Sequence, residues 1–353
     1  MKLSWLFICL VVLAFFAPSP ATAVPESPLA VVATLPDYAW LAKRIGGDRV
    51  TVQHIVRGDQ DAHFIRPKPS FITMVKNADL LIATGLDLEL WLPTVVDKSG
   101  NTMVRSGQPG YVAASQGMKL LEIPTILSRI EGGLHIHGNP HVTNSPLMVR
   151  VAARNIATGL VTRDPEGREY YQARVKKLLV ELDRRLYGQE LVKLLGSKTL
   201  NKLAASGKLV PFITSKSYRG KKLSEYAGGW VGKMLPLAGV SVTTYHKNWI
   251  YFLKLFGMVE TGTVEPRPGI PPSPRHVAEL ITLMKEREVR IILAANYFDE
   301  HKVRTIAESV GAIPVIVPLY VGGVPGTEDY FKLFDYWVEQ LVRAGHEAGI
   351  IPQ

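Results

Sequence analysis

Cysteine is nearly absent from this chain of 353 residues, in which Cys9 is the only one. It lies inside an apolar run, residues 6–16, that follows the positively charged Met1-Lys2. Small residues, Ala21-Thr22-Ala23, come next at the spacing of a cleavage site. This order predicts a signal peptide over residues 1–23, because the run is too short to span a membrane. The mature chain then has no cysteine, so disulfides and thiolate sites are excluded and any metal must be bound by nitrogen and oxygen.

Long apolar runs are equally scarce. Beyond the leader, no stretch of the sequence is long and apolar enough to cross a bilayer. A lipid-anchored protein would need a cysteine directly after the apolar run, whereas Cys9 lies within it. We therefore expect a soluble protein that is exported through a cleaved signal peptide, most simply to the periplasm.

Acidic residues are in the minority. The 41 basic and 31 acidic residues give a formal net charge of +10, and loss of Lys2 with the leader leaves 40 against 31, or +9. Basic and acidic residues alternate along predicted helices, as in residues 176–181 and 285–290. This interleaving favours a solvated surface over attraction to nucleic acid or to an anionic membrane, so no nucleic-acid partner is expected.

Two catalytic motifs are also missing. The sequence contains neither the His-Glu-x-x-His run of zinc hydrolases nor the Gly-x-Ser-x-Gly motif of serine hydrolases. A zinc hydrolase would further need an open coordination position and a general base beside the metal. We expect a protein that is not an enzyme, with a zinc hydrolase as the less favoured alternative.

Short apolar strands alternate with helical segments in both halves of the chain. The predicted strands cover residues 30–34, 50–56, 79–84 and 118–123 in the first half and 240–245, 259–264, 289–295 and 313–317 in the second. This alternation predicts an α/β fold in which each half is a parallel β-sheet flanked by helices. About 330 mature residues exceed one comfortable core, which favours two lobes.

A helical segment connects the two halves. Ser145-Pro146 is typical of an N-cap and a first helical residue, and apolar residues follow at helical spacing. Asp164-Pro165 interrupts this pattern, which resumes from about Tyr170. We therefore divide the chain into a leader (1–23), an N-terminal lobe (24–160), an inter-lobe linker helix (161–190) and a C-terminal lobe (191–353) with an inserted region (191–239).

Four potential metal ligands occupy loops at comparable places in the two halves. His63, His246 and Asp299 each follow an apolar strand, and His141 lies in the loop before the connecting helix. In parallel sheets, ligands bind beyond the carboxyl ends of the strands. If the lobes face each other, three imidazoles and one carboxylate form a site for a borderline divalent cation.

The other histidines have simpler interpretations. His135 and His137 are expected in a solvated loop, with help in metal capture as the alternative. The remaining ones are expected on a sheet face or in the core (His54), in exposed first turns of helices (His276 and His301) and on the C-terminal helix (His346).

The set of motifs resembles one family. Asp61-Ala62-His63 followed by Pro67, Asn139-Pro140-His141 followed by Pro146, Thr244-Tyr245-His246 before an aromatic helix, and Asp299 after a late strand are similar to the motifs of the periplasmic zinc and manganese binding proteins of ABC importers, the ZnuA/TroA-like (cluster A-I) family. The resemblance covers essentially the mature chain.

The resemblance implies two lobes with parallel sheets, one inter-lobe helix, and a single metal ion at the interface. It places the ligands on His63, His141, His246 and Asp299. It also implies delivery of the metal to a membrane permease, and we expect the carrier to be a monomer. Three nitrogens favour Zn²⁺ over Mn²⁺, although Mn²⁺ or Fe²⁺ stays open, as does a metal-pinned adhesin. Water or another carboxylate, such as Glu260 or Glu300, is an alternative fourth ligand.

The chain departs from the family pattern in three places. Thr143-Asn144 replaces the aromatic residue that often follows the second histidine motif, and the region before His246 is long. The His/Asp-rich tract of many zinc members is absent.

Overall fold

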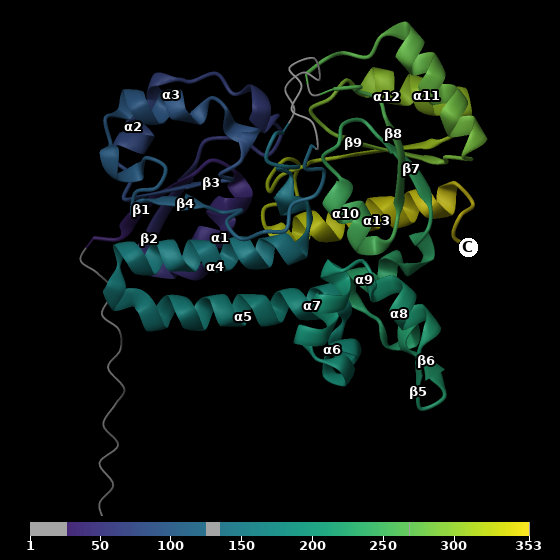
Figure 1. Cartoon of the computed structure of the whole chain (residues 1–353), viewed down its shortest axis with the longest axis horizontal. Helices are drawn as coiled ribbons and strands as arrows, with labels where there is room; N and C mark the ends of the chain where they lie inside the picture. The colour runs from purple at the N-terminus through teal and green to yellow at the C-terminus, as the bar shows by residue number, and fades with distance from the viewer. Residues whose placement is uncertain (1–26, 125–134, 268, 353) are drawn as a thin grey trace, which may run out of the picture.

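The computed structural model describes residues 27–124, 135–267 and 269–352. The expected signal peptide, residues 1–23, lies outside the described residues. Two parallel sheets of four strands, each flanked by helices, form the two lobes, so the predicted α/β class is confirmed (Figure 1). No helix in the described part of the chain has both the length and the apolar character needed to cross a bilayer.

The N-terminal sheet has the strand order β2-β1-β3-β4, and every pairing in it is parallel. Its strands are β1 (Leu29–Ala33), β2 (Val50–His54), β3 (Leu80–Ala83) and β4 (Tyr111–Ala113). Strand β3 is buried along its whole length, as expected for a sheet covered on both faces. Helices α1 (Pro36–Gly46), α2 (Pro69–Lys76) and α3 (Leu92–Ser99) belong to this lobe.

One strand was predicted in the wrong place. The fourth strand is β4 and not residues 118–123, which form no strand. The backbone of that segment makes a different contact, because the Leu121 amide donates to the Tyr251 hydroxyl and the Leu121 carbonyl accepts from the Asn139 amide. An apolar run can therefore line the junction between lobes without joining a sheet.

The C-terminal sheet has the order β10-β9-β7-β8, again entirely parallel. Its strands are β7 (Ser241–Thr244), β8 (Val259–Thr263), β9 (Ile291–Ala295) and β10 (Ile313–Val317). The helices between and after them are α10 (Ile250–Phe256), α11 (Pro274–Glu286), α12 (Glu300–Val310) and α13 (Tyr330–Glu347). The four strands predicted here from the sequence are all present.

Two antiparallel helices carry the chain from one lobe to the other. Helix α4 (Pro146–Arg163) begins at Pro146 as predicted and packs along α1, and α5 (Arg168–Tyr187) runs back towards the second lobe (Figure 1). The predicted break at Asp164-Pro165 is confirmed, because a 3-10 turn separates the two helices there. At about 1.5 Å per residue, the 20 residues of α5 span about 30 Å, close to the diameter of one lobe. The exact lobe boundaries, at residues 160 and 190, stay a prediction.

The segment between α5 and the second sheet is mostly helical. It contains α6 (Gln189–Leu195), α7 (Ser197–Ala205), α8 (Leu209–Ser215), a small hairpin and α9 (Gly229–Met234). The hairpin pairs β5 (Ser217–Tyr218) with β6 (Lys221–Lys222) in antiparallel fashion.

The lobes are packed against each other. Tyr251 donates its hydroxyl to the Asn139 carbonyl, and Tyr330 donates to the Thr143 carbonyl. A single hydrophobic cluster contains buried residues of both lobes, from Val31 to Trp337. The two lobes thus share one hydrophobic core.

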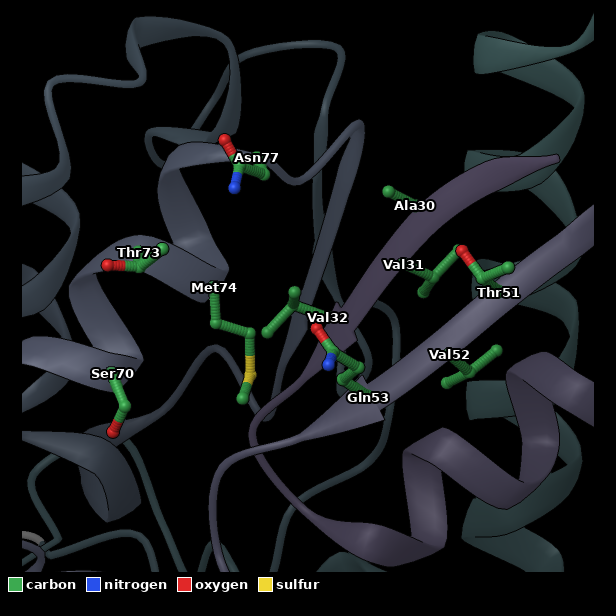
Figure 2. Close-up of a pocket in the computed structure, with 10 residues that line it drawn as sticks. All are labelled: Ala30, Val31, Val32, Thr51, Val52, Gln53, Ser70, Thr73, Met74 and Asn77. Carbon is green, nitrogen blue, oxygen red and sulfur yellow. The ribbon is translucent and has the colours of Figure 1, made fainter. Parts of the chain in front are cut away.

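A hollow on the N-terminal sheet lies apart from the predicted histidine ligands (Figure 2). Met74 of α2 faces strands β1 and β2 across it, and its walls include Thr51 and Asn77 but no histidine or carboxylate. It runs along the strands and not beyond their carboxyl ends, so it has neither the donors nor the position of a metal site.

Candidate metal centre

Four histidines meet between the lobes: His63, His135, His141 and His246. Each offers one ring nitrogen, and these nitrogens all lie within 4.8 Å of one another. Tetrahedral zinc with Zn–N bonds of 2.0–2.1 Å needs nitrogens about 3.4 Å apart. The cluster therefore has a spacing from which a tetrahedral metal site can form with small side-chain movements.

Each lobe contributes histidines to the cluster. His63 lies in a short 3-10 helix (Ala62–Phe64) beyond the end of β2, and His246 comes two residues after β7. His141 and His135 precede α4 in the loop that joins the lobes. His141 is 2% exposed and His246 is 4% exposed, so the cluster is shielded from solvent on the α4 and β7 sides.

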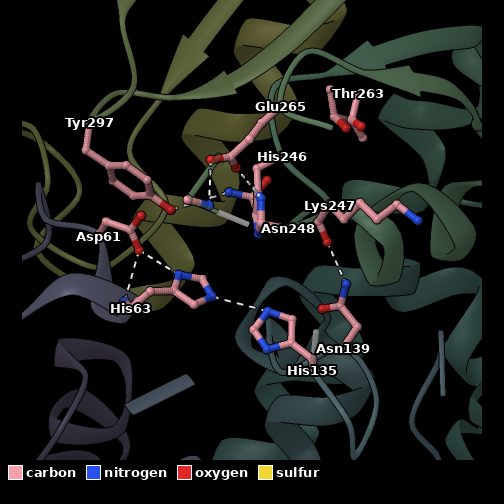
Figure 3. A network of polar contacts seen from close by, with 12 residues as sticks. Asp61, His63, His135, Asn139, His246, Lys247, Asn248, Thr263, Glu265 and Tyr297 are labelled. Atoms are coloured by element: carbon pink, nitrogen blue, oxygen red, sulfur yellow. Dashed lines mark hydrogen bonds and ion pairs between the residues drawn. The ribbon is translucent and has the colours of Figure 1, made fainter. Parts of the chain in front are cut away.

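Two carboxylates hold two of the rings. Asp61 accepts from Nδ1 of His63 at 2.7 Å and also from the His63 backbone amide at 3.0 Å (Figure 3). Glu265, two residues after β8, accepts from Nδ1 of His246 at 2.7 Å, while its second oxygen accepts from the Gly269 amide. When Nδ1 carries the proton, Nε2 presents its lone pair, which is the form that binds a metal.

The lone-pair nitrogens face one another. Nε2 of His63 lies 3.2 Å from Nε2 of His135 (Figure 3). Both ring nitrogens of His141, and Nε2 of His246, are buried without a hydrogen-bond partner among the described residues. Buried nitrogens without partners are costly unless something binds them, and a cation between the rings would satisfy them together.

The environment disfavours the charged form of two imidazoles in the cluster, His135 and His141. Burial, reinforced by the neighbouring His63 and His246, lowers the pKa of His135 to about 3. The same causes, burial first, lower the pKa of His141 well below its ordinary value. Burial alone would raise the pKa of Asp61, but the hydrogen bonds and charge of His63 outweigh it and the pKa is lowered. Neutral imidazoles and ionised carboxylates are the protonation states that metal binding requires.

Asn139 fixes the loop that carries His141. Its side-chain oxygen accepts from the His141 amide at 3.0 Å, and its amide group donates to the Lys247 carbonyl at 2.6 Å and to Glu122. One asparagine therefore ties the His141 loop to the residue that follows His246. The Asn139-Pro140-His141 motif thus positions the His141 ring of the cluster.

Asp299 is not part of this cluster, contrary to the prediction from the sequence. It is exposed and serves as the N-cap of α12, where its side chain accepts from the Lys302 amide at 3.2 Å. An aspartate just before a helix is a common N-cap, and this competing role accounts for its position. The suggested substitutes are also engaged elsewhere, since Glu260 accepts from Thr244 and Glu300 pairs with Arg304.

His135, expected in a solvated loop, instead contacts His63 and completes the cluster. No spacing signal in the sequence separates it from His137, whose side chain is 58% exposed and lies 3.8 Å from Asp87. Glu265 was also not recognised. The sequence feature that could have identified it is its position after β8, the strand that pairs with β7, which precedes His246.

The other histidines lie outside the cluster. His54 ends β2 on an exposed edge and not in the core, with Nδ1 2.8 Å from the Val56 carbonyl. His301 and His346 are exposed on helices as predicted, whereas His276 is half-buried, with Nε2 2.9 Å from the Thr263 carbonyl.

Comparison with known proteins places this chain in a family. The family profile of ZnuA, described as zinc-uptake complex component A, periplasmic, matches residues 31–186 and 222–344. The high-affinity zinc uptake system protein ZnuA of Bacillus subtilis (strain 168) is 26% identical over 288 residues, which cover 80% of this chain and 76% of that protein. The manganese ABC transporter substrate-binding lipoprotein PsaA of Streptococcus anginosus is 22% identical over 344 residues, or 95% of each chain.

A crystal structure of ZnuA has the same fold, with a TM-score of 0.66 at 21% sequence identity over 90% of this chain and 99% of that one. The profile match alone covers well over half of the sequence. The chain therefore belongs to the ZnuA family of metal-binding substrate-binding proteins of ABC importers, which are carriers and not enzymes.

Proposed function

We propose that this protein captures Zn²⁺ between its lobes and delivers it to the membrane permease of an ABC importer. The observation that carries the proposal is the cluster of four imidazoles, whose ligand atoms lie within 4.8 Å of one another. The proposed ligands are His63, His135, His141 and His246. A single cluster of this kind among the described residues supports one tightly bound ion per chain.

The donor set favours zinc. Four nitrogens and no carboxylate suit Zn²⁺, whereas Mn²⁺ prefers more oxygen ligands. The two carboxylates next to the site, Asp61 and Glu265, contact the far nitrogens of the rings and so raise the basicity of the ligands. One relative is named for zinc and another for manganese, so their names do not identify the metal of this chain. We therefore base the choice of Zn²⁺ on the donor set.

The proposed cellular setting follows from the same role. We propose a monomer that is exported to the periplasm after removal of residues 1–23 and that meets the permease there. Metal loading should change the structure only locally, because a rigid helical connection through α4 and α5 resists a wide hinge motion. A large change in radius of gyration on metal removal, measured by solution scattering, would oppose this.

Competition titration tests the metal assignment. The mature protein is titrated with Zn²⁺ and Mn²⁺ against a chromophoric chelator, and we expect one site that prefers Zn²⁺ by several orders of magnitude. Preference for Mn²⁺, or two equally tight zinc sites, would overturn the proposal. Deletion of the gene should lower zinc uptake, and unchanged uptake with reduced adhesion would favour the metal-pinned adhesin.

A further inference from the structure

Positive charge is concentrated in one segment of the chain. Residues 187–221, which we call the basic segment, contain seven lysines or arginines but a single acidic residue, Glu190. The family profile matches the chain on both sides of this segment and not within it. The part of the chain that the family profile does not match therefore contributes a net charge of about +6, out of +9 for the mature chain.

None of these seven cations is engaged in an ion pair with another described residue, and all seven side chains are exposed: Lys193, Lys198, Lys202, Lys208, Lys216, Arg219 and Lys221. Some helices elsewhere differ in that they contain exposed cations paired with acids four residues away, as in Arg275–Glu279 and Arg304–Glu300. The alternation of charge expected from the sequence thus holds for those helices but fails in the basic segment. Uncompensated charges raise the local positive potential over the segment.

The basic segment lies at the periphery of the molecule. Helix α6 and the hairpin of β5 and β6 form its outer edge, on the opposite side of the molecule from α11 and α12 (Figure 1). The hairpin tip exposes Tyr218, whose ring contacts the guanidinium of Arg219 at 5.2 Å. An exposed tyrosine among cations is a combination found where proteins contact the headgroups of a bilayer.

We infer that the basic segment binds the surface of a membrane rich in anionic phospholipid. The cations are spread over two helices, a turn and a hairpin, and are not gathered on one element. Scattered cations suit a surface of many equivalent phosphates, on which each contributes independently. Adsorption through this edge keeps the protein close to the membrane that contains its permease.

Vesicle co-sedimentation tests the inference. The mature protein, with zinc bound, is mixed with vesicles of phosphatidylcholine alone or with about one third phosphatidylglycerol. We expect binding only to the anionic vesicles, and release when the salt concentration is raised to about 0.5 M, because screening weakens surface electrostatics. Equal binding to both vesicles, or binding that resists salt, would overturn the inference.

Two charge-matched variants locate the surface. Changing Lys198, Lys202, Lys216 and Lys221 to Gln should weaken binding on the order of a thousandfold. The control changes Lys43, Lys76, Lys98 and Lys285 to Gln, which are also exposed and outside the ion pairs of the described residues.

The control should bind like the wild type, and both variants should keep wild-type zinc affinity. If both variants lost vesicle binding equally, the net charge of the protein and not the basic segment would account for binding, and the inference would be refuted. No binding to anionic vesicles together with binding to an acidic polypeptide would refute it in favour of a protein partner.

Discussion

Replacement of His135 and of Asp299 by Ala separates two assignments of the fourth ligand. In His135→Ala, three imidazoles remain and water must take the fourth position. Zinc sites of four ligands bind with about 10–16 kcal/mol, or about 3 kcal/mol for each ligand. We therefore expect zinc affinity to fall about a hundredfold, measured by competition with a chromophoric chelator.

Asp299→Ala should give the opposite pattern. The carboxylate caps α12 through the Lys302 amide and is not in the histidine cluster. Loss of an N-cap costs about 1 kcal/mol, so the metal-free variant should unfold at lower urea concentration while zinc affinity changes less than about threefold. If Asp299→Ala weakened zinc as strongly as His135→Ala, the four-histidine site would be wrong.

Three further changes test the surroundings of the site. Glu265→Gln leaves a weaker hydrogen-bond acceptor for the His246 ring, so zinc affinity should fall about 10–100-fold while the stoichiometry stays at one. Unchanged affinity would show that the carboxylate does not support the site. Burial raises the pKa of Asp37 from 3.8 to about 7. The neutral carboxyl therefore contributes fully to the free energy of unfolding below pH 3.8, and this contribution is lost as the pH rises towards 7. The free energy of unfolding of Asp37→Asn, measured with urea, should then rise relative to that of wild type by about 1.4 kcal/mol per pH unit across that range. A difference that does not depend on pH would contradict burial of this carboxyl as the cause. A Cβ on Gly58 would lie 2.4 Å from the Gly323 backbone nitrogen, so Gly58→Ala should lower the melting temperature by disturbing the lobe contact, and an unchanged value would refute that packing.

The sequence predicted the sheets well because buried parallel strands are continuous apolar runs. Residues 291–295 are buried without exception, and the prediction of a strand there was correct. Residues 118–123 also contain four apolar residues, yet they form no strand and none of them is fully buried, and their backbone bonds to Asn139 and Tyr251 at the lobe junction. A short run with several apolar residues is therefore not sufficient evidence of a buried strand.

The ligands show the same limit at the level of single side chains. Placement after strands singled out His63 and His246, which the structure brings into one cluster, because the ends of parallel strands meet at one edge of a sheet. Asp299 also follows a strand, but its carboxylate accepts a hydrogen bond from a backbone amide in the first turn of α12. His135 and His137 are two residues apart in one loop, and only the folded path of that loop distinguishes the ring beside His63 from the exposed one.

X-ray absorption at the zinc edge, on mature protein loaded with one equivalent of Zn²⁺, tests the proposed site most directly. The four-histidine site predicts about four nitrogen neighbours at about 2.0 Å with the multiple scattering of imidazole rings. In His135→Ala one imidazole should be replaced by an oxygen neighbour. A wild-type spectrum with three imidazoles and a carboxylate oxygen, unchanged in His135→Ala, would contradict the account.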